Sequence, residues 1–118
     1  MKTIMIVEDD TAIRETLMEL LESEGYNVIS SEHGERALGI LAQNPQVDLV
    51  LLDLSMPIMD GKTFLKEVKI RHPELNAMPI LIMTAAGPGD LPMDFNRNMI
   101  LRKPLDVDIL IEKIEKVV

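Results

Sequence analysis

The chain has 118 residues, 47% of them hydrophobic, which is enough for one domain with a buried core spanning residues 1–118. Its net charge is −8, and because an acidic surface repels nucleic-acid phosphates and attracts cations, we expect no direct nucleic-acid binding by this domain. The absence of cysteine excludes disulfides and thiolate metal sites, and no apolar segment suits a signal peptide or a membrane span, so we expect a cytoplasmic protein.

Short apolar runs alternate with segments of helical period along the chain. The predicted elements, in order, are a strand at residues 4–7, a helix from Ile13 that stops at Gly25, a strand at 27–30, a helix at 35–42, a strand at 48–54, a helix at 62–71, strands at 79–83 and 99–101, and a helix at 107–118. Residues 49–52 include no polar side chain, which is typical of a strand buried on both faces. This alternation predicts an α/β fold with a doubly wound, five-stranded parallel sheet.

One segment departs from the alternation. Residues 85–92 contain two prolines and two glycines at the place where a fourth helix would begin. Proline inside a helix removes a backbone donor and clashes with the preceding turn, and glycine adds chain entropy that a helix must suppress. We therefore expect residues 87–97 to form a short or irregular fourth helix.

Charged and hydroxyl side chains follow the predicted strands. They are Glu8, Asp9 and Asp10 after the first strand, Asp53 at the end of the third, Thr84 after the fourth and Lys103 after the fifth. In a sheet of this kind, ligands bind outside the carboxyl ends of the strands. Crowded carboxylates repel one another unless a cation lies between them, and oxygen ligands without cysteine favour Mg2+ or Mn2+ over zinc.

The same residue types suit phosphoryl transfer. That reaction requires charge neutralisation and positioning, with little other chemistry from the protein. A carboxylate such as Asp53 can itself be the nucleophile and form an aspartyl phosphate. The hydroxyl of Thr84 and the ammonium of Lys103 could hold the remaining phosphate oxygens.

In its order along the chain, this set resembles the receiver domains of bacterial response regulators. The matching motifs are Glu8-Asp9 after the first strand, DLSMPIMDG at residues 53–61, Thr84-Ala85, and Lys103-Pro104. Each motif is weak alone, but the ordered set covers nearly the whole chain. The resemblance implies a flavodoxin-like fold with strand order 2-1-3-4-5 and a place in two-component, histidine-to-aspartate phosphorelay signalling.

The resemblance also assigns a metal site. Asp53 matches the phospho-acceptor, which also contacts the metal. Asp9 matches the acid that binds the metal directly, and Glu8 matches the acid that usually acts through water. Ser55 matches the position whose backbone carbonyl is the third protein ligand. The implied cofactor is Mg2+, with Mn2+ as a possible substitute.

Two further residues complete the implied mechanism. Lys103 matches the lysine that pairs with Asp53 and later with the phosphate, and Thr84 matches the hydroxyl that moves toward the phosphate on activation. The implied partners are a histidine kinase or phosphotransfer protein and an unknown downstream protein or fused output domain. Such a domain is a monomer or weak dimer and catalyses only its own phosphorylation and dephosphorylation.

Two departures from the family pattern affect the expected output. Ile100 stands where the family normally has the aromatic switch residue, three positions before the lysine. The stretch between Thr84 and Lys103 is also a few residues shorter than usual. The phosphorylation chemistry is complete, but we expect the signal to leave by another face than the usual one.

Three other functions are weighed against this one. A phosphatase of the haloacid dehalogenase type would need a second acid where Ser55 stands, and the chain has no room for its capping insertion. An unphosphorylated docking module is favoured by Ile100 but disfavoured by the complete set of acids, threonine and lysine. A dinucleotide-binding module would need a glycine-rich turn after the first strand, where Glu8, Asp9 and Asp10 stand instead. Of these three acids, Asp10 is expected to cap the first helix.

Overall fold

The computed structural model describes most of the chain, namely residues 2–44, 46–53, 63, 66–67, 70–71, 79–84, 100–103 and 106–118. Its elements in chain order are β1 (Thr3–Val7), α1 (Thr11–Ser23), β2 (Asn27–Ser31), α2 (Gly34–Gln43), β3 (Leu49–Asp53), β4 (Ile80–Thr84), β5 (Ile100–Arg102) and α4 (Val107–Val117). Each of these elements was predicted, with bounds that differ by about one or two residues, as is usual for helix and strand ends.

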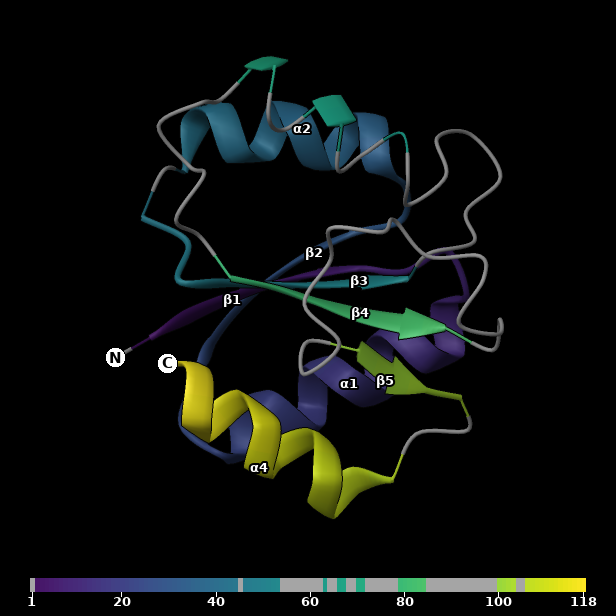
Figure 1. The fold of residues 1–118 in the computed structure, drawn as a ribbon, viewed down its shortest axis with the longest axis vertical. Coiled ribbons are helices and arrows are strands. Elements are labelled where there is room, and N and C mark those ends of the chain that lie inside the picture. The colour runs from purple at the N-terminus through teal and green to yellow at the C-terminus, as the bar shows by residue number, and fades with distance from the viewer. Residues whose placement is uncertain are drawn as a thin grey trace.

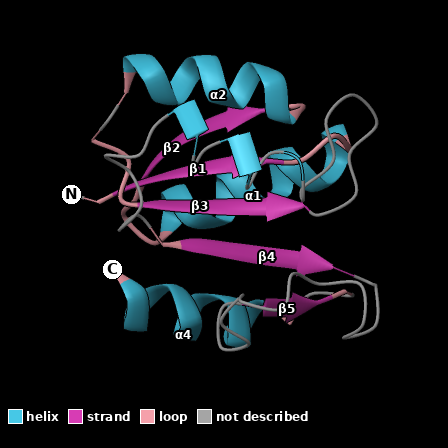
Figure 2. Cartoon of the chain, turned by 45° about the horizontal axis from the view of Figure 1, so that its top comes forward, coloured by secondary structure: helices cyan, strands magenta, loops and turns pink. Residues whose placement is uncertain are grey.

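The strands form one parallel sheet in the order β2-β1-β3-β4-β5. Figure 2 shows the arrowheads of all five strands at the same end of the sheet. The predicted fold class and strand order are therefore confirmed. Because every strand runs the same way, the residues that follow the strands collect along one edge.

Helices cover both faces of the sheet (Figure 1): α2 lies on one face, and α1 and α4 lie on the other. Successive side chains of a strand point to opposite faces, so β1 sends Met5 and Val7 toward α2 and Ile4 and Ile6 toward α1 and α4. The core side chains of β1, β3 and β4 are almost all fully buried. This two-sided burial explains why the central strands are unbroken apolar runs.

Helix α1 is closed at both ends by contacts that the sequence indicated. Asp10 is its N-cap, and its carboxylate accepts a hydrogen bond from the backbone N–H of Ile13 at 3.0 Å. At the other end Gly25 has a positive φ of 93°. The N–H of Gly25 donates to the Glu22 carbonyl and that of Tyr26 to the Leu21 carbonyl, which is the Schellman arrangement. Both the capping role of Asp10 and the stop at Gly25 are confirmed.

The other helices with described bounds, α2 and α4, also begin at side-chain caps. Asp106 caps α4 and accepts from the backbone N–H groups of Asp108 and Ile109. His33 caps α2 through its ring nitrogen Nδ1, which accepts from the N–H of Arg36 at 3.3 Å. An imidazole is not among the preferred caps, so the sequence did not predict this one.

Two predicted helices lie wholly or partly outside the described residues. The short or irregular fourth helix falls in residues 87–97, which the structure does not describe. For the helix predicted at 62–71, the described residues 63, 66–67 and 70–71 are helical, while Phe64, Leu65 and Val68 lie outside the description. Among the described helices, none has the length and hydrophobicity needed to cross a membrane.

Mutation of Asp10 distinguishes its role as the cap of α1 from any role with the neighbouring acids Glu8 and Asp9. Asp10→Ala removes the acceptor for the Ile13 N–H, and we expect it to lower the free energy of unfolding by about 1 kcal/mol. Asp10→Ser, which keeps an acceptor, should recover most of this loss in urea unfolding. A variant Asp10→Ala that unfolds like wild type but binds divalent cations more weakly would show that Asp10 serves the neighbouring acids and not the helix.

Candidate functional site

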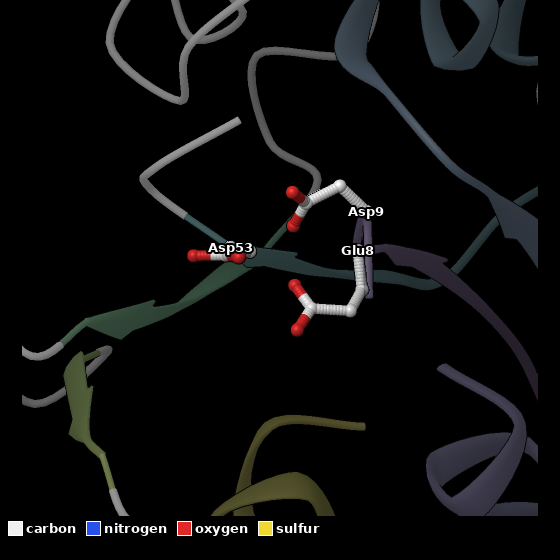
Figure 3. Close-up of side chains that lie close together, drawn as sticks. All are labelled: Glu8, Asp9 and Asp53. Carbon is white, nitrogen blue, oxygen red and sulfur yellow. The ribbon is translucent and has the colours of Figure 1, made fainter. Parts of the chain in front are cut away.

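The sheet register brings three acids together at its carboxyl edge. Val7 pairs with Leu52 across β1 and β3, so the next residues, Glu8 and Asp53, are neighbours at the strand ends. One carboxylate oxygen from each of Glu8, Asp9 and Asp53 lies within 4.8 Å of the others. Figure 3 shows the carboxylates of Glu8 and Asp9 turned toward the side on which Asp53 lies. We call these three residues the acidic cluster.

Two members of the acidic cluster are shielded from water. Glu8 is 1% exposed and Asp53 is 3% exposed, whereas Asp9 is exposed. Neither carboxylate oxygen of Glu8 has a hydrogen-bond partner within the described part of the protein. A buried carboxylate without a donor is costly, and a divalent cation supplies what the site lacks. The oxygen-only donor set fits Mg2+ or Mn2+.

Lys103 is the cation that the described residues place beside the cluster. Its Nζ lies 3.2 Å from Oδ2 of Asp53 and 3.9 Å from Oε1 of Glu8, the second distance being too long for a hydrogen bond. The backbone N–H of Lys103 donates to the Thr84 carbonyl at 2.8 Å, which fixes the lysine just past β5. Among the described residues, this ammonium therefore lies beside two of the three carboxylates, and it can balance the charge of only one of them.

Burial and this crowding change the titration of Glu8. The pKa of Glu8 is raised from its ordinary 4.5 to about 8, first by loss of hydration and then by hydrogen bonding to and repulsion from the neighbouring Asp53, against a smaller lowering by Lys103. The hydrogen bond to Asp53 exists only when one of the two carboxyls carries a proton. As two ionised groups, they can only repel. The site therefore holds either a proton or a cation more readily than it holds full negative charge.

Thr84 and Ile100 lie on the strands beyond Asp53. Met83 pairs with Asp53 across β3 and β4, so Thr84 is the next residue toward the acidic edge, and it is 3% exposed. Ile100 is half-buried at the beginning of β5, paired with Ile82. Ser55, predicted to offer its carbonyl to a metal, lies outside the described residues.

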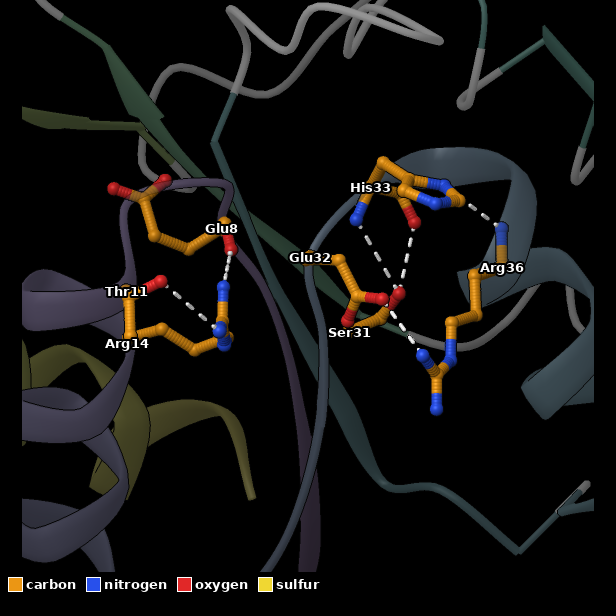
Figure 4. A network of polar contacts seen from close by, with 7 residues as sticks. All are labelled: Glu8, Thr11, Arg14, Ser31, Glu32, His33 and Arg36. Atoms are coloured by element: carbon orange, nitrogen blue, oxygen red, sulfur yellow. Dashed lines mark hydrogen bonds and ion pairs between the residues drawn. The ribbon is translucent and has the colours of Figure 1, made fainter.

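The backbone of Glu8 is held by two residues that the sequence did not reveal. Its N–H donates to the Ser31 carbonyl of β2 at 3.0 Å, and its carbonyl accepts from Nη1 of Arg14 at 2.9 Å (Figure 4). Because both contacts are made to main-chain atoms of Glu8, residue types give no direct signal of them. The one available hint is an arginine in the first turn of the helix that follows the acids.

A doubly wound parallel sheet with buried acids and a lysine at its carboxyl edge is the architecture of a signalling receiver. The family of response regulator receiver domains matches residues 4–115 by its sequence model, and this chain belongs to that family. The resemblance noted in the sequence is thereby confirmed.

Known relatives support this membership. The transcriptional regulatory protein CpxR of Klebsiella pneumoniae is 40% identical over 87 residues, covering 74% of this chain and 35% of CpxR. The DNA-binding transcriptional regulator NtrC of Salmonella typhimurium is 34% identical over 98% of this chain and 24% of its own length. The solved chemotaxis response regulator CheY4 of Vibrio cholerae superposes with a TM-score of 0.85 at 27% identity, covering 100% of this chain and 99% of CheY4. The chain thus spans about a third or less of the two transcriptional regulators.

The raised pKa of Glu8 predicts a particular pH dependence of stability. Between pH 4.5 and about 8 the folded protein binds this proton more tightly than the unfolded chain does, so this contribution to stability falls as the pH rises. Without divalent cations, the free energy of unfolding of Glu8→Gln should equal that of wild type at about pH 5. At about pH 8.5 it should exceed that of wild type by ~1.4 kcal/mol or more, the equivalent of one pKa unit.

Urea unfolding at the two pH values measures this difference, with Glu19→Gln on the exposed side of α1 as the matched loss of charge. Equal stability differences between Glu8→Gln and wild type at both pH values would contradict the raised pKa.

Proposed function

We propose that this chain accepts a phosphoryl group on Asp53 from a phosphohistidine, with a divalent cation in the acidic cluster, and so works as the phosphorylation switch of a two-component system. The observation that carries the proposal is the surroundings of Asp53. Its carboxylate is buried at the end of β3, lies within 4.8 Å of two further acids, and has the Lys103 ammonium at 3.2 Å.

The chemistry assigned to Asp53 is a nucleophilic displacement. A carboxylate oxygen of Asp53 attacks phosphorus, a P–O bond forms as the P–N bond of the phosphohistidine breaks, and the electron pair of that bond stays on the imidazole nitrogen. Before transfer, the Lys103 ammonium pairs directly with the Asp53 carboxylate at 3.2 Å. After transfer the same ammonium is close enough to pair with a phosphoryl oxygen.

In this proposal the cluster residues hold the cation. Asp9 and Asp53 would bind Mg2+ directly, the Ser55 carbonyl would be the third protein ligand, and Glu8 would act through water. When bound, Mg2+ neutralises charge on the phosphoryl oxygens. Thr84, at the same edge on β4, would offer its hydroxyl to the phosphoryl group after transfer.

The proposed setting follows from the family. The phosphoryl donor would be a histidine kinase or a phosphotransfer protein, and the output would lie in a downstream protein or a fused domain. The two transcriptional regulators among the relatives are much longer than this chain, so DNA binding in those proteins does not have to come from the part shared with this one. We propose that this domain is cytoplasmic, a monomer or weak dimer, and active only in its own phosphorylation and dephosphorylation.

Intact-mass spectrometry after treatment with acetyl phosphate and Mg2+ tests the proposal. Wild type should gain the mass of one phosphoryl group, and chelation of the Mg2+ should abolish the gain. Asp53→Asn should gain nothing, because an amide oxygen is a far weaker nucleophile than a carboxylate.

Asp10→Asn is the matched control, since it removes one carboxylate next to the cluster and keeps an acceptor for the helix cap. Phosphorylation of Asp53→Asn to the level of wild type would refute the assignment of the acceptor.

A further inference from the structure

We propose that Arg14 is a positioning residue for the cation site, because it fixes the peptide group that joins Glu8 to Asp9. The inference rests on the proposed metal-dependent phosphorylation. The inference adds Arg14 to the site, because this residue contacts a backbone atom of the acidic cluster. Among the ion pairs of the described residues, the cluster pairs with Lys103 and not with Arg14.

The contact starts in the first turn of α1. The half-buried side chain of Arg14 reaches from this turn to the end of β1, where Nη1 donates to the Glu8 carbonyl at 2.9 Å. Its second terminal nitrogen, Nη2, lies 3.5 Å from the hydroxyl of Thr11, a longer contact on the same side (Figure 4). The planar guanidinium is thus directed at a main-chain oxygen of the cluster and not at a carboxylate.

The opposite side of Glu8 is fixed by β2. The Glu8 N–H donates to the Ser31 carbonyl at 3.0 Å, and the fully buried Ser31 in turn donates its hydroxyl to the His33 carbonyl at 2.8 Å. Glu8 therefore has its N–H held by a strand and its carbonyl held by a helix. If the arginine were removed, the carbonyl would be left to water.

Holding that carbonyl determines where Asp9 points. The Glu8 carbonyl and the Asp9 nitrogen belong to one rigid peptide plane, so fixing the oxygen fixes the direction in which the Asp9 backbone continues. Asp9 is exposed, so its surroundings hold its side chain less firmly than those of buried Glu8 and Asp53 hold theirs. A ligand set must be held within about 0.5 Å of the productive geometry, and contacts to groups that carry ligands are the usual means of doing so.

The charge of Arg14 and its positioning role have opposite effects on cation affinity. A guanidinium near the cluster repels a divalent cation, so loss of its charge alone would tighten Mg2+ binding. Loss of the fixed peptide plane would weaken Mg2+ binding. The sign of the change in affinity therefore distinguishes the two effects.

The test compares Arg14→Gln, Arg14→Lys and wild type by calorimetric titration with Mg2+, at a temperature where circular dichroism shows all of them folded. We expect the Kd for Mg2+ to rise about tenfold in Arg14→Gln, the lower end for residues that hold metal ligands in place. In Arg14→Lys we expect a rise of about threefold, because an ammonium keeps the charge but lacks the planar fork.

A kinetic readout separates positioning from general loss of structure. With acetyl phosphate as donor, the Mg2+ concentration for half-maximal phosphorylation should rise with the Kd, while the rate at saturating Mg2+ should stay within about threefold of wild type. Arg36→Gln is the matched control, because Arg36 also stands in the first turn of a helix, α2, but its side chain pairs with Glu32 at 2.7 Å and not with an acid of the cluster.

An unchanged or lower Kd for Mg2+ in Arg14→Gln, with normal phosphorylation of Asp53, would overturn the inference and leave the proposed function intact. If Arg14→Gln does not fold, Arg14→Lys decides alone, and a Kd within about twofold of wild type overturns the inference. Failure of wild type to bind Mg2+ or to be phosphorylated would instead refute the proposed function and, with it, the role of Arg14.

Discussion

Mutual repulsion among the carboxylates of Glu8, Asp9 and Asp53 is the constraint around which this molecule is arranged. One carboxylate oxygen from each lies within 4.8 Å of the others, two of the three side chains are buried, and among the described residues Lys103 lies beside Asp53 and Glu8. At such distances, in a partly desolvated site, like charges interact by several kcal/mol. The repulsion can be relieved by a proton, as the raised pKa of Glu8 indicates, or by a divalent cation. A group that adds charge to Asp53 would change this balance again, which is the physical basis of a phosphorylation switch.

The rest of the fold offsets the unfavourable repulsion within the acidic cluster. The sheet is buried on both faces, and a one-residue shift of β1 against β3 would move every core side chain of the shifted strand to the wrong face. The carboxylates that repel one another are confined to the strand ends, and none of them belongs to the hydrophobic clusters that form the described core. The ends of α1 and α2 are closed by caps, and the Glu8 backbone is held from β2 and from α1. The acids are therefore kept close by main-chain geometry and not by attraction between their side chains.

Patterns of residue types in the sequence were sufficient to predict most of the fold and most of the candidate site residues. The central strands were recognisable because burial on both faces removes all polar residues from residues 49–52. The acids, Thr84 and Lys103 were recognisable because they follow strands whose carboxyl ends must meet. Contacts to the backbone were not predictable: the imidazole cap of α2 and the Arg14 bond to the Glu8 carbonyl depend on where main-chain atoms lie. Helical spacing also overstates burial at helix ends, since Ile13 shares the period of Leu17 and Leu21 yet is 38% exposed.

The central claim is that the acidic cluster is held in place against repulsion and is relieved by a cation. Urea unfolding of wild type and Asp53→Asn, each with and without Mg2+, tests it most directly. Without Mg2+ and above about pH 8, where Glu8 loses its proton, the account predicts that Asp53→Asn is the more stable protein. The substitution then removes one of three charges and leaves Lys103, which lies 3.9 Å from Glu8, to pair with that acid. With Mg2+ at about ten times its Kd, wild type should gain about 1.4 kcal/mol and the variant much less. A wild type that is unaffected by Mg2+, together with a variant that is less stable than wild type in its absence, would contradict the account.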